Sequence, residues 1–253
     1  MTMRYLSLFL VAILPAAGAE TLVEQSNETR FQLDFTVPDA ALKAFLPAGW
    51  TSAPATEGAA KDCNLRVIFI DRVTINDPKG APLGKGSNRF VLLAAPVKDP
   101  QGSNVQLVIG GLTEDAADAP GPFGNFLQAA THVMNRETIS GKPGPIVETQ
   151  DWIFSAAGGE HLEMHITYQR GTANKRNMTD VKYYSAKNPA FFHISRQELI
   201  LDIMRNATTN PPDHVRKFSF KGAGGTYSKL FDGTEKVVSW DNVLWLNRSI
   251  LLP

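Results

Sequence analysis

The fold class of this chain is decided by the segment Gly86-Ser87-Asn88-Arg89-Phe90-Val91-Leu92-Leu93-Ala94-Ala95-Pro96-Val97. A second apolar run, Val105 to Gly111, follows it and ends in the acidic turn Leu112-Thr113-Glu114-Asp115. Short apolar runs of this kind, bounded by turn residues, are typical of strands that are buried on both faces. The two runs therefore predict a strand-rich core.

Other segments predict strands because β-branched and aromatic residues cluster between turn signals. Phe31 to Phe35 alternates apolar and polar residues, and Leu65 to Ile75 is apolar on both faces at its centre. Their mostly short connections favour an antiparallel sheet. The remaining predicted strands are Phe90–Val97, Val105–Ile109, Ile146–Phe154, His161–Tyr168, Val181–Tyr184, Val215–Phe220, Thr226–Phe231, Lys236–Trp240 and Val243–Leu246.

Three helices are predicted beside these strands. Pro38–Phe45 begins with a proline, which suits a first helical turn, and Phe123–Arg136 has apolar residues at helical spacing. Ser195–Asn206 opens with Ser195 and Glu198 three residues later, the pattern of a capping box. The chain is therefore expected to be α+β, with a mainly antiparallel β-barrel or two-sheet β architecture and about three peripheral helices.

The segment from Gly86 onward resembles the central part of the acetoacetate decarboxylase family. Upstream, Val37 to Trp50 is similar to that family's short helix, which ends in a Leu-Pro-x-Gly turn, here Leu46-Pro47-Ala48-Gly49. With a closing strand region at residues 215–252, the resemblance covers most of the chain. It implies an acetoacetate decarboxylase-like domain over residues 20–253, with a central cavity for a small organic ligand such as an oxo acid or another carbonyl compound. No cofactor is predicted.

The same resemblance bears on catalysis. The family has a Gly-x-Pro-Lys-Lys motif in which one lysine forms a Schiff base, its pKa lowered by the neighbouring ammonium. The nearest counterpart here, Ser140-Gly141-Lys142-Pro143-Gly144-Pro145, holds one lysine in a different order relative to proline. Phe90 occupies the place of the family's active-site glutamate. If the protein is an enzyme, the resemblance implies a carbon–carbon lyase in which Lys142 forms the imine and Glu163 or His165 moves a proton.

The alternatives are an exposed turn lysine at position 142 and a non-catalytic protein. Unpaired lysines are usually solvated. Proteins that share a fold also often differ in function. The second hypothesis is therefore a periplasmic or envelope-associated small-molecule binding protein built on the same barrel.

A polar row is predicted within His161-Leu162-Glu163-Met164-His165-Ile166. On a strand, His161, Glu163 and His165 lie on one face, with neighbouring positions roughly 6 to 7 Å apart. Two such side chains can hold one metal ion, so His161 and His165 are candidate ligands, and a polar strand facing solvent or a lumen is the alternative. A further ligand would come from another strand, for example His132, His193 or Asp151.

The first nineteen residues have the pattern of a signal peptide: Arg4, the apolar stretch Tyr5–Leu14 and the small residues Ala17-Gly18-Ala19. The apolar stretch is interrupted at Pro15 and is short for a membrane span, so no stable membrane anchor is expected. The predicted location is the periplasm or the extracellular medium.

Composition limits the class of protein further. Cys63 is the single cysteine, so no intramolecular disulfide is possible. Lys plus Arg and Asp plus Glu each number 25, which argues against a dedicated nucleic-acid binder. The expected partner is a small-molecule ligand. Aromatic residues near Trp240 and Trp245 suit either core packing or the interface of a homo-oligomer.

Overall fold

A computed structural model describes residues 20–117, 123–141, 144–177, 180–205 and 214–253. Seven of its strands close into a barrel in the order β5-β10-β11-β13-β1-β3-β4, and β4 pairs with β5 to complete the ring. All neighbours in this ring are antiparallel except β10 and β5, which are parallel. The barrel strands are β1 (Thr21–Thr36), β3 (Leu65–Asn76), β4 (Asn88–Lys98), β5 (Asn104–Thr113), β10 (Val181–Ser185), β11 (Phe192–Arg205) and β13 (Lys236–Leu252).

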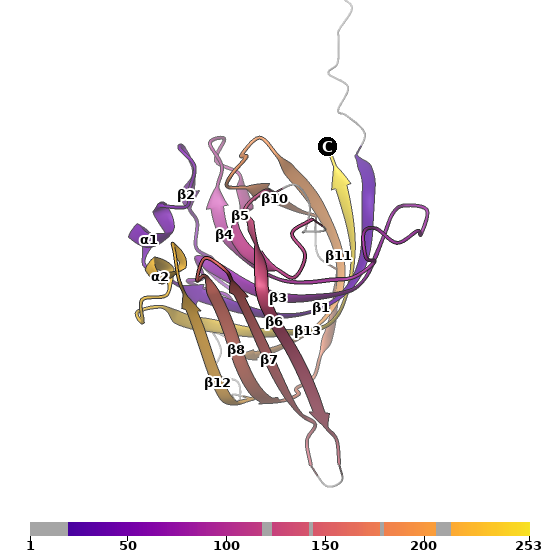
Figure 1. Cartoon of the computed structure of the whole chain (residues 1–253). Helices are drawn as coiled ribbons and strands as arrows, with labels where there is room; N and C mark the ends of the chain where they lie inside the picture. Colours follow the sequence, from indigo (N-terminus) through magenta and orange to yellow (C-terminus); the bar gives the residue numbers. More distant parts are fainter. Residues whose placement is uncertain (1–19, 118–122, 142–143, 178–179, 206–213) are drawn as a thin grey trace, which may run out of the picture.

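A second group of strands branches from this barrel at β5. β5 continues into β6 through a short parallel pairing of Gly111–Thr113 with Phe126–Gln128, and β6, β7, β8 and β12 then follow as an antiparallel sheet. We call these four strands the outer sheet; it lies against the outside of the barrel wall (Figure 1). Its strands are β6 (Phe126–Ile139), β7 (Val147–Ala156), β8 (His161–Gln169) and β12 (Val215–Ala223). The remaining elements are the strands β2 (Thr51–Ser52) and β9 (Asn174–Asn177) and the helices α1 (Asp39–Lys43) and α2 (Tyr227–Leu230).

The main hydrophobic core lies between the outer sheet and the barrel wall. Alternate residues of β8 are buried, and Tyr168 packs against Phe31 of β1 with ring centroids 5.8 Å apart. Trp152 of β7 packs likewise against Phe69 of β3. Because successive side chains of a strand point to opposite faces, the residues of β1 that alternate with Phe31 face the barrel lumen.

Two of the three predicted helices are wrong. Of the predicted helix Phe123–Arg136, residues 126–136 belong to strand β6, and of the predicted helix Ser195–Asn206, residues 195–205 belong to β11, while Asn206 lies outside the described residues. Strand pairing decides both: β6 pairs with β7 over Ala129–Ile139, and β11 pairs with β13 over almost its whole length. These long-range hydrogen bonds override local helical spacing.

Other predictions are confirmed or corrected in detail. The predicted helix Pro38–Phe45 contains α1, and the mainly antiparallel barrel is confirmed. Thr226–Phe231, predicted as a strand, contains the short helix α2. The predicted strands Lys236–Trp240 and Val243–Leu246 belong to one long strand, β13. Within the described residues only two helices occur, of five and four residues, in place of the three predicted.

No helix in the described ranges is long and apolar enough to cross a membrane. The predicted signal peptide, residues 1–19, lies outside the described residues and stays a prediction.

Candidate functional site

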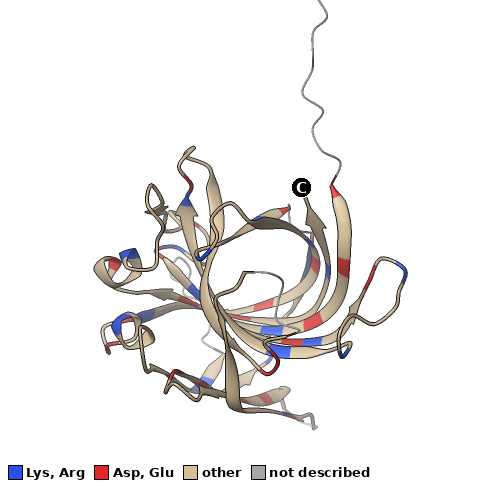
Figure 2. Cartoon of the chain, turned by 45° about the horizontal axis from the view of Figure 1, so that its top comes forward, with Lys and Arg blue, Asp and Glu red and all other residues tan. Residues whose placement is uncertain are grey.

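A row of buried polar side chains runs along the lumenal face of β1. Ser26, Glu28, Arg30 and Asp34 are each at most 5 % exposed, and Gln32 continues the row. Figure 2 shows acidic and basic positions side by side on neighbouring strands of the barrel wall. Because such groups are costly to bury without partners, their contacts define the chemistry of the lumen.

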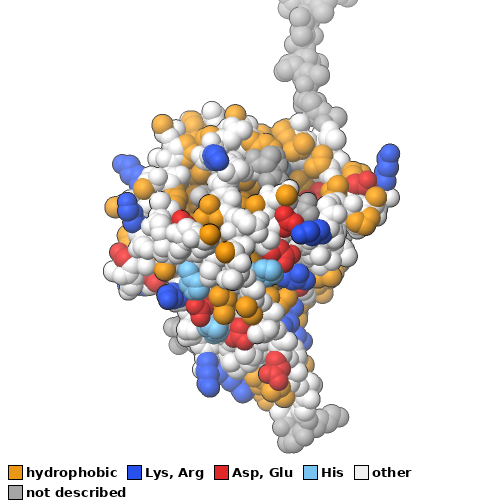
Figure 3. Space-filling model, in the orientation of Figure 1, with side chains coloured by type: hydrophobic (Ala, Val, Ile, Leu, Met, Phe, Trp, Pro, Cys, Tyr) orange, Lys and Arg blue, Asp and Glu red, His pale blue; other side chains and the backbone are white. Residues whose placement is uncertain are grey.

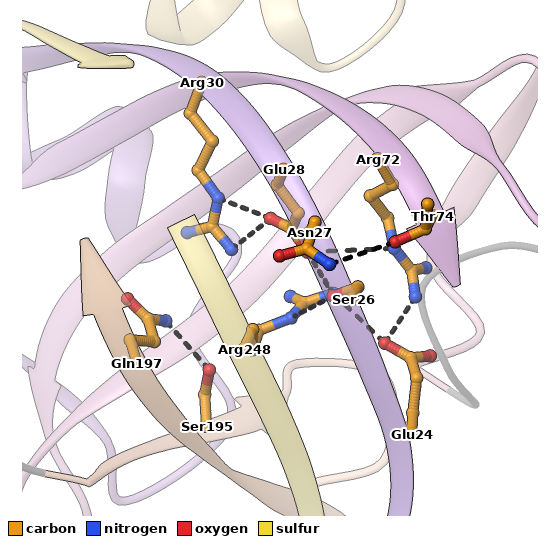
Figure 4. A network of polar contacts seen from close by, with 10 residues as sticks. All are labelled: Glu24, Ser26, Asn27, Glu28, Arg30, Arg72, Thr74, Ser195, Gln197 and Arg248. Atoms are coloured by element: carbon orange, nitrogen blue, oxygen red, sulfur yellow. Dashed lines mark hydrogen bonds and ion pairs between the residues drawn. The ribbon is translucent and has the colours of Figure 1, made fainter. Parts of the chain in front are cut away.

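Glu28 is the centre of a cluster of ion pairs (Figure 4). Its Oε2 accepts a hydrogen bond from Arg30 Nε at 2.7 Å, and its Oε1 lies 2.7 Å from Arg248 Nη2. Arg72 Nε lies 3.8 Å from the same Oε1, and Arg72 also forms an ion pair with Glu24. Three strands, β1, β3 and β13, therefore contribute charges to one buried cluster.

This cluster has more cations than anions. It holds the guanidinium groups of Arg30, Arg72 and Arg248 and the carboxylates of Glu24 and Glu28, an excess of one positive charge. Burial alone would raise the pKa of Glu28, but Arg248, Arg30 and Arg72 outweigh it and lower this pKa to about 2. Glu28 is thus ionised at any physiological pH, and its charge is shared among three guanidinium groups.

His193 of β11 lies beside this cluster and is 7 % exposed. Burial, followed by the nearby charges of Arg248 and Arg72, lowers its pKa to about 3. Its ring packs edge-on against Phe123, with centroids 4.8 Å apart. At neutral pH the imidazole is therefore uncharged, and it offers one N–H donor and one acceptor nitrogen.

The cluster borders a cavity of about 130 Å³ whose other walls are mainly apolar. Its charged and polar lining comes from Arg30, Arg248, Glu24, His193 and Tyr183. Engineered dry cavities of roughly this size accept a benzene-sized molecule. The dimensions therefore suit a small organic ligand with one anionic group. The apolar lining comes mostly from Ile68, Ile70, Leu92, Phe123, Phe191 and Ile250.

A second cavity, of about 320 Å³, shares Arg30 and Tyr183 with the first and is lined by Asp34, Asp241 and Arg66. Asp34 Oδ1 accepts a hydrogen bond from Gln32 at 3.0 Å and lies 3.4 Å from Arg66 Nε. Burial, and then the charge of Asp34, raise the pKa of Asp241 to about 7. This half of the lumen therefore holds a carboxyl group whose pKa lies well above that of an exposed aspartate.

The predicted row of β8 lies elsewhere. Leu162, Met164, Ile166 and Tyr168 point into the core, so His161, Glu163 and His165 lie on the opposite, partly exposed face of the outer sheet, away from the barrel lumen. Figure 3 shows histidine and acidic side chains gathered on this face of the molecule. Glu163 and His165 therefore do not face the lumen, where their predicted role in proton transfer would require them to be.

These side chains form a hydrogen-bonded chain. Glu163 Oε2 lies 2.7 Å from His161 Nε2, and Glu163 Oε1 lies 2.5 Å from His165 Nε2. The outer ring nitrogens contact Ser155 Oγ at 2.8 Å and Asp151 Oδ1 at 2.7 Å. Hydrogen bonds from His165 and His161 lower the pKa of Glu163, and those to Asp151 and Glu163 raise the pKa of His165.

Every ring nitrogen of His161 and His165 is thus already engaged. In the part of the chain that the structure describes, no group of three or more His, Cys, Asp or Glu side chains is arranged to hold a metal ion. Metal binding by His161 and His165 stays a prediction without support from this geometry.

Lys142, the predicted imine-forming residue, lies outside the described residues. Phe90 is fully buried in the apolar cluster that contains Leu92 and Ile70 of the first cavity.

Sequence reasoning missed the lumenal charges on β1 and β13. A usable signal was present: polar and large apolar residues alternate from Arg30 to Phe35, and charged residues recur at the even positions 24, 28, 30 and 34, which share one face of a strand. A period of two with large apolar residues on one face and paired charges on the other indicates a strand whose polar face is also buried. The ion pair between Glu28 and Arg248 could not be predicted, because the two residues lie near opposite ends of the sequence.

No protein-family model and no curated protein matches this sequence. Solved structures do match. The enduracididine biosynthesis enzyme MppR, with HEPES buffer bound, has a TM-score of 0.59 at 13 % identity, over 93 % of this chain and 87 % of that one. MppR complexed with the condensation product of pyruvate and imidazole 4-carboxaldehyde has a TM-score of 0.56 at 12 % identity, over 90 % and 87 %.

A third solved structure extends the likeness to nearly the whole of both chains. An acetoacetate decarboxylase-like enzyme from Sphingomonas wittichii RW1 has a TM-score of 0.56 at 10 % identity and covers 96 % of this chain and 98 % of its own. At such low identity these likenesses concern the fold. They confirm that the chain has an acetoacetate decarboxylase-like fold.

Proposed function

We propose that this protein, whose fold is that of the acetoacetate decarboxylase-like enzymes, binds a small oxo acid or related organic anion in its barrel lumen. The observation that carries the proposal is the excess guanidinium charge of Arg30 and Arg248 at the wall of the apolar cavity. An uncompensated buried charge is costly. A bound carboxylate would neutralise it, and the apolar wall would cover the carbon part of the ligand.

The donor geometry suits this class of ligand. A guanidinium presents its N–H groups in a planar fork that matches a carboxylate. His193, uncharged at neutral pH, has a donor available for a carbonyl oxygen without adding a second positive charge. A ligand with adjacent carboxylate and carbonyl groups would use both.

Pyruvate is the first probe, because MppR, which has the same fold, binds the condensation product of pyruvate and imidazole 4-carboxaldehyde. Isothermal titration calorimetry should show pyruvate binding to the wild-type protein. Arg248→Met should weaken it about ten-fold or more, the loss expected for one charge-assisted contact of about 1.4 kcal/mol or more. Arg196→Met is the matched control, since Arg196 is more than half exposed on β11, where it pairs with Ser249, the residue after Arg248 on β13.

Methyl pyruvate separates charge recognition from shape. It keeps the carbonyl and the carbon skeleton but lacks the anion, so it should bind much more weakly than pyruvate. Equal binding of the ester and the acid, or unchanged pyruvate binding by a folded Arg248→Met variant, would overturn the proposal.

The more specific proposal is lyase activity, which requires a lysine that forms an imine with the substrate. No lysine occurs among the described residues that line the two cavities, so Lys142 is the candidate that the family resemblance supplies. Incubation with keto acids and borohydride, followed by intact-mass analysis, should give a stable adduct on Lys142 that is absent from Lys142→Ala. Detectable binding without any lysine adduct would favour the second candidate, a non-catalytic binding protein.

Export is proposed from the signal-peptide pattern alone. Its test is the amino-terminal sequence of the protein recovered from its native host: Glu20 as the first residue of a periplasmic or secreted form supports it.

A further inference from the structure

Among the residues that the structure describes, strand β6 has one long edge without a partner strand. It pairs with β7 from Ala129 to Ile139, but with β5 only from Phe126 to Gln128. Across the described ranges, no other strand pairs with the second edge of β6 beyond Gln128. Eleven residues span roughly 36 Å of strand, so a long row of backbone N–H and C=O groups is available there.

The side chains of this strand are also unusually exposed. Between Ala130 and Ile139 every residue is exposed except Met134, which is partly buried. Val133 is 41 % exposed and Ile139 is 61 % exposed. By contrast, alternate residues of β7 are buried. The β6–β7 hairpin extends beyond the end of the barrel (Figure 1), although Arg136 of β6 still donates a hydrogen bond to Thr29 of β1.

Native sheets usually protect such edges with lysine, proline or other charges. β12, the strand at the other side of the outer sheet, follows this rule, because it carries Arg216, Lys217 and Lys221. β6 has neither lysine nor proline, and its formally charged residues, Arg136 and Glu137, cancel. Two copies of β12 would repel each other, whereas two copies of β6 would not.

We propose that β6 of one molecule pairs antiparallel with β6 of a second copy about a two-fold axis, joining the two outer sheets into one continuous sheet. The formal net charge of +0 for the whole chain removes long-range repulsion between copies. A two-fold arrangement satisfies both open edges at once and closes the assembly as a dimer. The interface covers Val133 and Ile139. Neither cavity needs a residue of the second copy to complete it.

The geometry gives a sharp test. In an antiparallel pair related by a two-fold axis, the residue on the axis faces its own copy, with Cα atoms roughly 4.5 to 5.5 Å apart. That separation permits a disulfide. Met134 is the midpoint of Ala129–Ile139, so the axis is expected near it. The native Cys63 is buried and does not interfere.

The experiment combines cross-linking with mass measurement. Cysteine is placed in turn at Val133, Met134, Asn135 and Arg136, and Lys217→Cys on β12 is the control. Under oxidising conditions, one β6 variant should form a disulfide-linked dimer in high yield, its neighbours much less, and Lys217→Cys almost none.

Size-exclusion chromatography with light scattering supplies the second measurement. Wild type should be a dimer, and Val133→Lys should raise the dimer dissociation constant about ten-fold or more. Val73→Lys is the matched control, because Val73 is 54 % exposed on β3 of the barrel, and it should leave the dimer unchanged. A monomeric wild type, a dimer unaffected by Val133→Lys, or preferential cross-linking through Lys217→Cys would overturn the proposal.

Discussion

Arg248 and Glu28 form a buried ion pair inside the barrel, with Arg248 Nη2 2.7 Å from Glu28 Oε1. Both side chains are less than a tenth exposed, and they come from β13 and β1, which are adjacent in the barrel but lie at opposite ends of the sequence. Glu28 also contacts Arg30 and Arg72, so one carboxylate interacts with all three guanidinium groups of the cluster. The stability of the barrel and the proposed affinity for an anion therefore depend on the same groups.

Glu28→Gln should destabilise the fold strongly. Removing one member of a buried ion pair costs about 3 to 5 kcal/mol, because the partner charges remain buried. The pKa of Glu28 falls from 4.5 to about 2 on folding, so its contribution is fully present above about pH 4.5 and is lost as the pH falls through about 2. Urea denaturation should show a steep loss of stability in this window for wild type and a flatter profile for the variant. Exposed Glu57→Gln is the control; a Glu28→Gln protein as stable as that control would contradict the assigned role.

Asp241→Asn should stabilise the protein at high pH. The pKa of Asp241 rises from 3.8 to about 7 on folding, because of burial and then the charge of Asp34. The folded state holds the extra proton, so this group's contribution is present below about pH 3.8 and is lost as the pH rises through about 7. An asparagine side chain does not ionise, so the variant does not lose this stability as the pH rises. The free energy of unfolding should increase by up to about 4 kcal/mol at pH 8 and change little at pH 4. Exposed Asp62→Asn is the control, and a gain that does not depend on pH would rule out this explanation.

Leu92→Trp should block ligand binding without unfolding the protein. Leu92 lines the first cavity and is 6 % exposed, so the larger ring would occupy the space proposed for pyruvate. Overpacking of this kind costs about 1 to 3 kcal/mol. Calorimetry should detect no pyruvate binding, and the control Leu92→Met, which preserves volume, should bind like wild type. Retained affinity in a folded Leu92→Trp protein would place the ligand elsewhere.

Asp151→Asn should lower the pKa of His165. Hydrogen bonds to Asp151 and Glu163 hold this pKa above 6.5, and their stabilising effect is present below that value and lost as the pH rises through the folded pKa. An NMR titration of the imidazole C–H signals measures the change, with Asp62→Asn as the control. An unchanged His165 pKa in the Asp151→Asn variant would argue against the hydrogen-bonded chain.

The same titration tests the predicted metal site. An ion bound by His161 and His165 would keep both imidazoles deprotonated, so equimolar Zn²⁺ would abolish the protonation step of His165. Because every ring nitrogen of the pair is hydrogen-bonded within the described structure, we expect the step to survive.

Sequence patterns succeeded where the signal was local and strong. The continuous apolar run at Phe90–Val97 and the alternation in His161–Tyr168 both predicted strands that the structure contains. The helix predicted at Ser195–Asn206 failed because residues spaced three and four apart also fit a long strand whose two faces are both covered. There Ser195 is a buried residue of β11 that accepts a hydrogen bond from Gln197 at 2.8 Å and caps no helix.

The sequence by itself determined that the chain is rich in strands, that its core is apolar without disulfide support, and that it resembles acetoacetate decarboxylases. Only the tertiary structure decided which strands meet. Closure of the barrel brings Arg248 next to Glu28 and directs the row on β8 away from the lumen. The physical reason is that periodicity fixes which side chains share a face of a strand, whereas the partner and register of each strand depend on contacts between residues far apart in the chain.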